Sequence, residues 1–171
     1  MKRTSGFTIV ELLIVIVVIG ILAAITIVAY NGIQGRANDT AIQSDLINNA
    51  KKLEIYRLDN DAYPTGDATT LTAELTAADL KFTKGSYAPA TGTTSTVVYL
   101  NNDNGADFAL MAISKSGKTF YYSSKVGVTK EWTDTHYTFP GSITYIKSSL
   151  GMNGSPNSWI YTPAGWVSWA K

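Results

Sequence analysis

Apolar side chains form one unbroken stretch near the start of the chain. From Leu12 to Ala29 there are eighteen residues without a charge, and only Gly20 and Thr26 interrupt the apolar series. About twenty helical residues cross a hydrocarbon core of roughly 30 Å, so the stretch is long enough to span a bilayer. A secretory signal has an apolar region of only about 7–15 residues. The length therefore predicts a membrane-spanning helix.

A second apolar pattern follows with helical spacing. Five apolar residues recur at intervals of four, four, three and three, namely Ile42, Leu46, Ala50, Leu53 and Tyr56. This spacing predicts an amphipathic helix with one buried stripe. Joined to the first segment, it gives one helix from Phe7 to about Leu58, roughly 78 Å long at 1.5 Å per residue. The alternative is two helices separated at residues 31–35, because each glycine there costs about 1 kcal/mol in a helix. We favour one helix with a flexible collar.

Strand patterns dominate the rest of the chain. The Asp and Asn cluster before Pro64 ends the long helix, and a short helix is expected from Leu71 to Leu80, with Leu71, Leu75 and Leu80 on one face. β-rich segments with intervening turns lie at 96–100, 107–114 and 118–123, and further strands are expected around 143–147 and 159–162. Both faces of the 107–114 strand are apolar. The predicted fold is α+β, with an antiparallel sheet packed across the amphipathic half of the long helix.

A single acid, Glu11, stands directly before the apolar run. A carboxylate at the edge of a bilayer costs several kcal/mol unless it is protonated or paired. Lys2 and Arg3 precede the run without any acid, so the positive-inside bias places Met1 in the cytoplasm and the rest of the chain outside.

These residues together resemble a known N-terminus. Lys2-Arg3, the segment Gly6-Phe7-Thr8-Ile9-Val10-Glu11-Leu12-Leu13 and the later Gly20-Ile21-Leu22-Ala23-Ala24 are similar to the class III leader and first helix of type IV pilins, which the pseudopilins of type II secretion share. The resemblance covers about the first thirty residues. It implies that a prepilin peptidase cuts between Gly6 and Phe7, that the new amine of Phe7 is N-methylated, and that the apolar helix stays attached.

The same resemblance gives Glu11 a role in assembly. After cleavage Phe7 carries a cationic amine four residues before Glu11, a spacing that places the two on one helix face. The acid can neutralise its own N-terminus, or, as the resemblance implies, meet the amine of a neighbouring subunit in a filament. An unmatched subunit would leave both charges bare, so the pair would favour the correct register. The plainer alternative is that Glu11 only stabilises the first helical turn through the helix dipole, which contributes about 0.3–1 kcal/mol to helix stability.

The chain departs from the family pattern at Val28, where pilins of this kind usually carry a proline associated with bending of the helix. Without that proline, we expect any bend or unwound segment around Gly20 or at the collar formed by Gly32 and Gly35.

Composition excludes several classes of function. The 171 residues carry a net charge of +1, which becomes 1 − 2 = −1 when Lys2 and Arg3 are removed with the leader, so no electrostatic case exists for nucleic acid. There is no cysteine and one histidine, His136, and no catalytic motif stands out. We expect neither an enzyme nor a cofactor. The expected organisation is a leader at 1–6, an apolar helix at 7–30, its amphipathic half at 31–60 and a head at 61–171, with a variable loop at 61–95 and a sheet and aromatic-rich region at 96–171.

Two regions invite a ligand hypothesis. The oxygen-rich loop Asn101 to Asp107 suggests calcium, but it lacks the spacing of an EF-hand, and turn chemistry explains it better. The C-terminal third is rich in aromatics, of which Trp159, Trp166 and Trp169 are candidates for stacking on a ligand. The alternative, which we favour, is that the aromatics fill the core of the head and subunit contacts.

Three functions remain open on the sequence. The first is the repeating subunit of a type IV pilus, a helical homopolymer serving adhesion, twitching motility or DNA uptake. The second is a pseudopilin of a type II secretion or competence machine, and the third is a minor tip pilin that acts as an adhesin. By resemblance, the partners are further copies of the chain, the prepilin peptidase, and the assembly ATPase and platform protein. The precursor would be a single-pass cytoplasmic-membrane protein, and the assembled filament would be extracellular.

Overall fold

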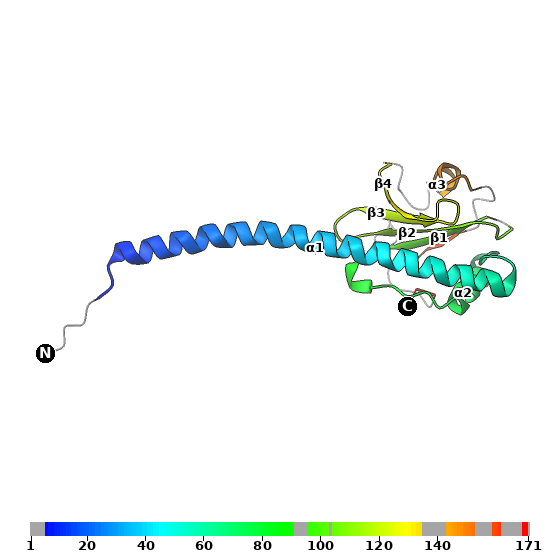
Figure 1. The fold of residues 1–171 in the computed structure, drawn as a ribbon, viewed down its shortest axis with the longest axis horizontal. Coiled ribbons are helices and arrows are strands. Elements are labelled where there is room, and N and C mark those ends of the chain that lie inside the picture. Colours follow the sequence, from blue (N-terminus) through cyan, green and yellow to red (C-terminus); the bar gives the residue numbers. More distant parts are fainter. Residues whose placement is uncertain are drawn as a thin grey trace.

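The protein consists of one long helix and a head built around its second half (Figure 1). The computed structural model describes residues 6–90, 96–102, 104–134, 143–152, 159–161 and 169–170. Helix α1 spans Ile9–Asn60, 52 residues, and continues without a break through Gly20, Gly32 and Gly35. The expected single helix is therefore confirmed, and the alternative of two helices separated at residues 31–35 is wrong.

Both ends of α1 have a local cause. Thr8 is the N-cap, and it forms a capping box with Glu11. At the other end Asp61 adopts a left-handed conformation with φ 60°, which ends the helix just before the Tyr63-Pro64 pair. The predicted stop at the Asp and Asn cluster is confirmed.

The head contains a five-stranded antiparallel sheet in the order β4-β3-β2-β1-β5. Its strands are β1 Val97–Asn101, β2 Phe108–Ile113, β3 Thr119–Ser123, β4 Thr129–Trp132 and β5 Trp159–Tyr161. In the register, Tyr99 of β1 faces Leu110 of β2 and Ile160 of β5. The strands expected near 96–100, 107–114, 118–123 and 159–162 are confirmed, whereas β4 was not expected.

One predicted strand is wrong. Residues 143–147 belong to helix α3, Ile143–Ser149, and not to the sheet. Ile143, Ile146 and Leu150 are buried, at spacings of three and four, which is the period of a helix that rests one face on a sheet. The β-branched residues in the segment suggested a strand, but the burial of one helical face decides its conformation.

Two apolar layers enclose the sheet. On one face, Phe108, Leu110 and Ala112 of β2 pack in the cluster that contains the buried stripe of α1. On the other face, Ala109 and Met111 pack with α3. The expectation that β2 is apolar on both faces and rests on the long helix is confirmed. Of the predicted stripe, Ile42, Leu46, Ala50 and Leu53 are fully buried and Tyr56 is partly buried.

The segment between α1 and the sheet is held by polar contacts with α1. Helix α2 spans Ala68–Ala77, and Leu71, Leu75 and Leu80 are buried as expected. The fully buried Asn49 donates from Nδ2 to the carbonyl of Lys81 over 2.7 Å and accepts from the Lys81 amide over 2.8 Å. These two bonds fix the chain after α2 to the middle of the head half of α1.

Candidate assembly site and the loop around Asp107

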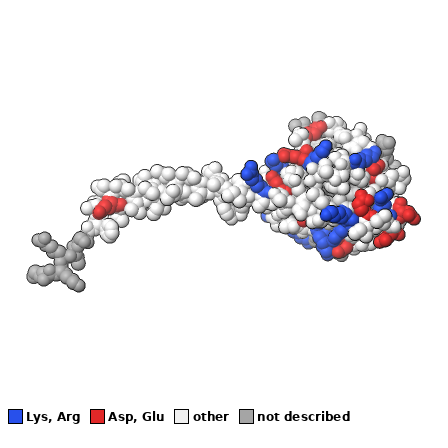
Figure 2. Space-filling model, in the orientation of Figure 1, with Lys and Arg blue, Asp and Glu red and all other residues white. Residues whose placement is uncertain are grey.

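The N-terminal half of α1 has no cover within the protein. Every large apolar side chain from Phe7 to Ile33 is 48–85 % exposed, and the first buried residue of the stripe is Ile42. Figure 2 shows this half as an almost uncharged rod with one acidic spot near its end. α1 contains an apolar window long enough to cross a membrane, and none of that window is buried, unlike the core helix of a soluble protein. Such a surface needs a bilayer or other apolar helices around it.

Glu11 forms the polar end of this exposed half. Its Oε2 accepts hydrogen bonds from the Thr8 amide over 2.8 Å and from the Thr8 hydroxyl over 2.7 Å, while the Glu11 amide donates to the Thr8 hydroxyl over 3.3 Å. In the isolated chain the carboxylate therefore closes the first helical turn, which is the role of the plainer alternative. Phe7, next to this cap, is 85 % exposed. The amine that cleavage would create on Phe7 lies one residue from the groups that hold Glu11.

The predicted flexible positions are regular helix in this structure. A Cβ added at Gly20 or Gly32 would meet nothing within 4 Å, while one at Gly35 would lie 3.6 Å from the Cβ of Ser116. Gly35 thus marks the level at which the head begins to touch α1. A bend at Gly20 or at the collar in a filament stays a prediction.

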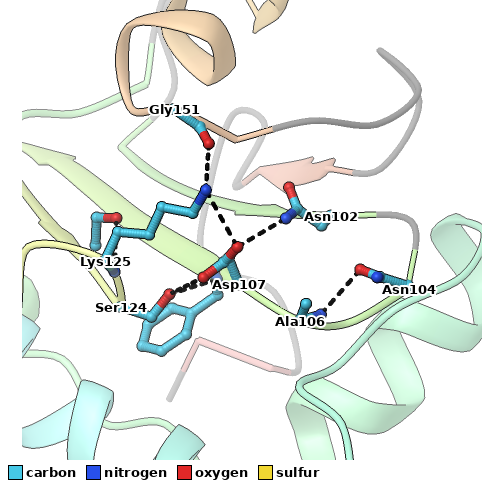
Figure 3. Close-up of polar contacts among 9 residues, drawn as sticks. Asn102, Asn104, Ala106, Asp107, Ser124, Lys125 and Gly151 are labelled. Carbon is cyan, nitrogen blue, oxygen red and sulfur yellow. Dashed lines mark hydrogen bonds and ion pairs between the residues drawn. The ribbon is translucent and has the colours of Figure 1, made fainter.

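At the opposite end of the head, the loop between β1 and β2 is organised by Asp107 (Figure 3). Its carboxylate accepts from Asn102 Nδ2 over 2.9 Å and from the Ser124 hydroxyl over 3.3 Å, and it lies 3.4 Å from Lys125 Nζ. The ammonium of Lys125 also donates to the carbonyl of Gly151 after α3. One carboxylate and one lysine therefore connect the β1–β2 loop, the end of β3 and the end of α3.

For the calcium hypothesis at residues 101–107, the described regions of the chain offer no cluster of acidic ligands. No group of three or more His, Cys, Asp or Glu that could hold a metal ion occurs among the described residues. A lysine ammonium occupies the side of Asp107 where a cation would bind, and Asn104 uses its side-chain oxygen to accept the Ala106 amide over 3.1 Å. The loop is a turn, and Gly105 within it has φ +63°.

Truncating Asp107 to Ala should destabilise the head by about 1–3 kcal/mol, because the Asn102 side-chain amide would lose its acceptor and the Lys125 ammonium would keep only the Gly151 carbonyl. Urea unfolding of the full chain in detergent, followed by tryptophan fluorescence, measures this loss. Glu131→Ala is the control, since its pair with Lys118 is exposed and such pairs contribute about 0–1 kcal/mol. Equal losses in the two variants would contradict a structural role for Asp107 beyond a surface ion pair.

Of the three tryptophans that were candidates for stacking on a ligand, the structure rules out Trp169. It is only 1 % exposed and packs edge-on to Phe82, with ring centroids 6.3 Å apart. It fills the core, so no ligand can stack on it. Trp166 lies outside the described residues, as does His136, and of Trp159 only the backbone in β5 is described.

Two residues that position the head were not found from the sequence. Asn49 lies on the buried side of α1, where the apolar stripe gave no reason for an amide. Asp45 accepts from the Thr83 amide over 2.5 Å and from the Tyr87 hydroxyl over 2.9 Å. Burial, reinforced by the Asp45 charge, raises the pKa of Tyr87, so the phenol stays a donor at neutral pH. Both contacts join residues more than thirty positions apart, and no local pattern signals them.

Comparison with known proteins bears on the exposed half of α1. The family model described as the prokaryotic N-terminal methylation motif matches residues 1–27. The first 27 residues therefore carry an N-terminal methylation motif. The long helix packed on an antiparallel sheet is consistent with the α+β fold of a pilin.

Relatives from a pilus and from a secretion system both match this chain. It is 40 % identical over 75 residues to the type IV wide pilus major component PilA4 of Thermus thermophilus. The aligned segment is 44 % of this chain and 57 % of that protein. It is 39 % identical over 64 residues to the type II secretion system core protein G of Aeromonas hydrophila, covering 37 % of this chain and 45 % of the relative. The chain thus spans about half the length of the curated relatives it matches. No solved structure gives a significant match.

These relatives are structural subunits and not enzymes, which agrees with the expectation from the sequence. They support a pilin or pseudopilin, and they divide between a pilus and a secretion system. The prepilin motif and the exposed apolar helix together fit membrane anchoring.

Proposed function

We propose that this chain is the structural subunit of a type IV pilus, which polymerises through the N-terminal half of α1. The observation that carries the proposal is the exposed apolar surface from Phe7 to Ile33 on a pilin-like fold. In the precursor this half lies in the cytoplasmic membrane, with Met1 on the cytoplasmic side. In the filament the same surface is covered by the helices of other copies, so burial against protein replaces burial in lipid.

Maturation prepares this surface for assembly. A prepilin peptidase removes residues 1–6, and the new amine of Phe7 is methylated. Glu11 then exchanges its bonds with Thr8 for the Phe7 amine of a neighbouring subunit, which neutralises two charges inside an apolar bundle. A cytoplasmic ATPase and a platform protein supply the force that moves the subunit out of the bilayer. The output is a surface filament for adhesion, twitching motility or DNA uptake.

The second candidate is a pseudopilin of a type II secretion or competence machine. The similarity to core protein G relatives supports it, because those relatives match with nearly the same identity as the pilus component. The two candidates use the same N-terminal helix and differ in the length and abundance of the filament.

Abundance separates them. Mass spectrometry of filaments sheared from cells of the source organism should find this chain as the dominant protein, starting at Phe7. The control is a strain that lacks the prepilin peptidase, in which the sheared fraction should contain none of it. Recovering only traces from the unaltered strain would contradict the role of major pilin and leave the pseudopilin and the minor tip pilin as candidates.

A further inference from the structure

Charge is divided between the two ends of the head. Both colours occur at each end in Figure 2, but basic side chains prevail where α1 enters the head and acids prevail at the far end. We call the first group the collar patch; it consists of Arg36, Lys84, Lys115 and Lys118. We call the second group the end patch; it consists of Asp59, Asp61 and Asp67.

Polar contacts place the collar patch at one level of the rod. The Ser116 hydroxyl donates to Asp39 of α1 over 2.5 Å, which sets the β2–β3 turn, with Lys115 and Lys118, beside the start of the head. The Lys115 amide donates to the carbonyl of Ser86, so the short helix η1, Lys84–Ser86, joins the same level. Within the described residues, Lys118 is paired with Glu131, whereas Arg36 and Lys115 have no ion-pair partner.

The end patch lies at the last turn of α1 and at the start of α2. Asp59 and Asp61 have no ion-pair partner among the described residues, and Asp67 caps α2 through the amides of Thr69 and Thr70. The nearby cations are engaged elsewhere, since Arg57 pairs with Glu54 and Lys125 with Asp107. The end of the head therefore keeps a surplus of negative charge that nothing in the described chain neutralises.

The helix surface between the two patches is also without a partner. Ile47, Ile55 and Leu58 are 38 %, 59 % and 75 % exposed, and their spacing of eight and eleven residues puts them on one side of α1. The exposed Lys51 lies on the same side between Ile47 and Ile55, so charge, and not a continuous apolar surface, distinguishes the two ends of the head.

We propose that the collar patch of one subunit contacts the end patch of a second copy, displaced by about 35 Å along the filament axis, the rise of the 23 helical residues from Arg36 to Asp59. The inference rests on the proposed filament. A contact between opposite ends of one molecule is heterologous, and a heterologous contact that does not close into a ring generates a filament. Opposite charge at the two ends attracts successive copies and disfavours an inverted one, in which like charges would meet.

Charge reversal at each end tests the contact. Arg36→Glu with Lys115→Glu gives the collar patch two acids against Lys84, since Lys118 is paired with Glu131. Asp59→Lys with Asp61→Asn and Asp67→Asn gives the end patch one cation and no acid, and asparagine can still cap α2. All five side chains are exposed and outside the internal ion pairs. Each of these two variants should lower the yield of sheared filaments by at least about tenfold. The chain with all five substitutions has the charges of the two patches exchanged and should recover most of the yield. Arg36→Lys with Lys115→Arg keeps the charge and should assemble normally.

Processed subunit in the membrane fraction is measured for every variant, so that loss of folding or of leader removal is not counted as loss of assembly. Failure of the five-substitution chain to recover, while its processed subunit stays abundant, overturns the contact. The contact is also overturned if filament yield falls in the variant of the collar patch but not in the variant of the end patch. That result would indicate that the collar patch binds an anionic lipid surface. If the unaltered chain gives no filaments, the proposed function itself is wrong. That outcome differs from the two results that would overturn only the contact.

Discussion

Glu11→Gln should leave leader removal intact and lower the yield of filaments by at least about a hundredfold. In the proposed filament, the substitution leaves the Phe7 amine of a neighbouring subunit without a counter-charge, and breaking a buried ion pair by removing one partner costs about 3–5 kcal/mol. Glutamine is close in shape to glutamate and can still close the capping box with Thr8. The measurement compares processed subunit in membranes with subunit in the sheared fraction.

Thr8→Ala separates pairing from capping. It removes the side chain that accepts the Glu11 amide and donates to the Glu11 carboxylate, but it keeps the charge. Loss of an N-cap costs about 1 kcal/mol, so filament yield should fall only modestly. The opposite pattern, with Thr8→Ala severe and Glu11→Gln mild, would mean that Glu11 acts as a helix-start acid and would reject the pairing role.

The elements predicted correctly from the sequence are those whose pattern is local. The buried stripe of α1 repeats at helical spacing, and the strands around Leu100, Leu110 and Phe120 are β-rich and bounded by turns. Strand β4 was not predicted, because Thr129–Trp132 is an edge strand with two charged residues. It is a strand only through its pairing with β3. α3 was mistaken for a strand because only the sheet beneath it shows which of its faces is buried.

The candidate sites divide in the same way. The N-terminal motif is contiguous, so its residues could be named from the sequence, and the capping geometry of Glu11 follows from its spacing to Thr8. The burial of Trp169 depends on Phe82, almost ninety residues earlier, which no pattern near the C-terminus reveals. The Asp107–Lys125 pair likewise joins two turns that only the strand register brings together.

Gly105→Ala should be the most damaging small substitution in the head, because the turn after β1 is built against the end of α1. Gly105 has φ +63°, and a Cβ there would lie 2.7 Å from the carbonyl oxygen of Tyr63 and 2.9 Å from the Cβ of Ala62. The Gly105 carbonyl accepts the Tyr63 amide over 2.9 Å, so the clash would push apart backbone segments that are hydrogen-bonded to each other. Backbone strain of this kind costs about 1–3 kcal/mol, and the displaced contact adds to it.

Gly127→Ala is the matched control for that substitution. Gly127 has φ +72°, close to the value at Gly105, but a Cβ there would meet nothing within 4 Å. Both variants carry the left-handed backbone penalty of about 1 kcal/mol, and only Gly105→Ala adds the clash with Tyr63. Urea unfolding of the full chain in detergent should therefore show Gly105→Ala the less stable of the two by at least about 1 kcal/mol. Equal stabilities would mean that the turn moves away from α1 at no cost, and that the contact between Gly105 and Tyr63 does not hold the end of the helix to the sheet.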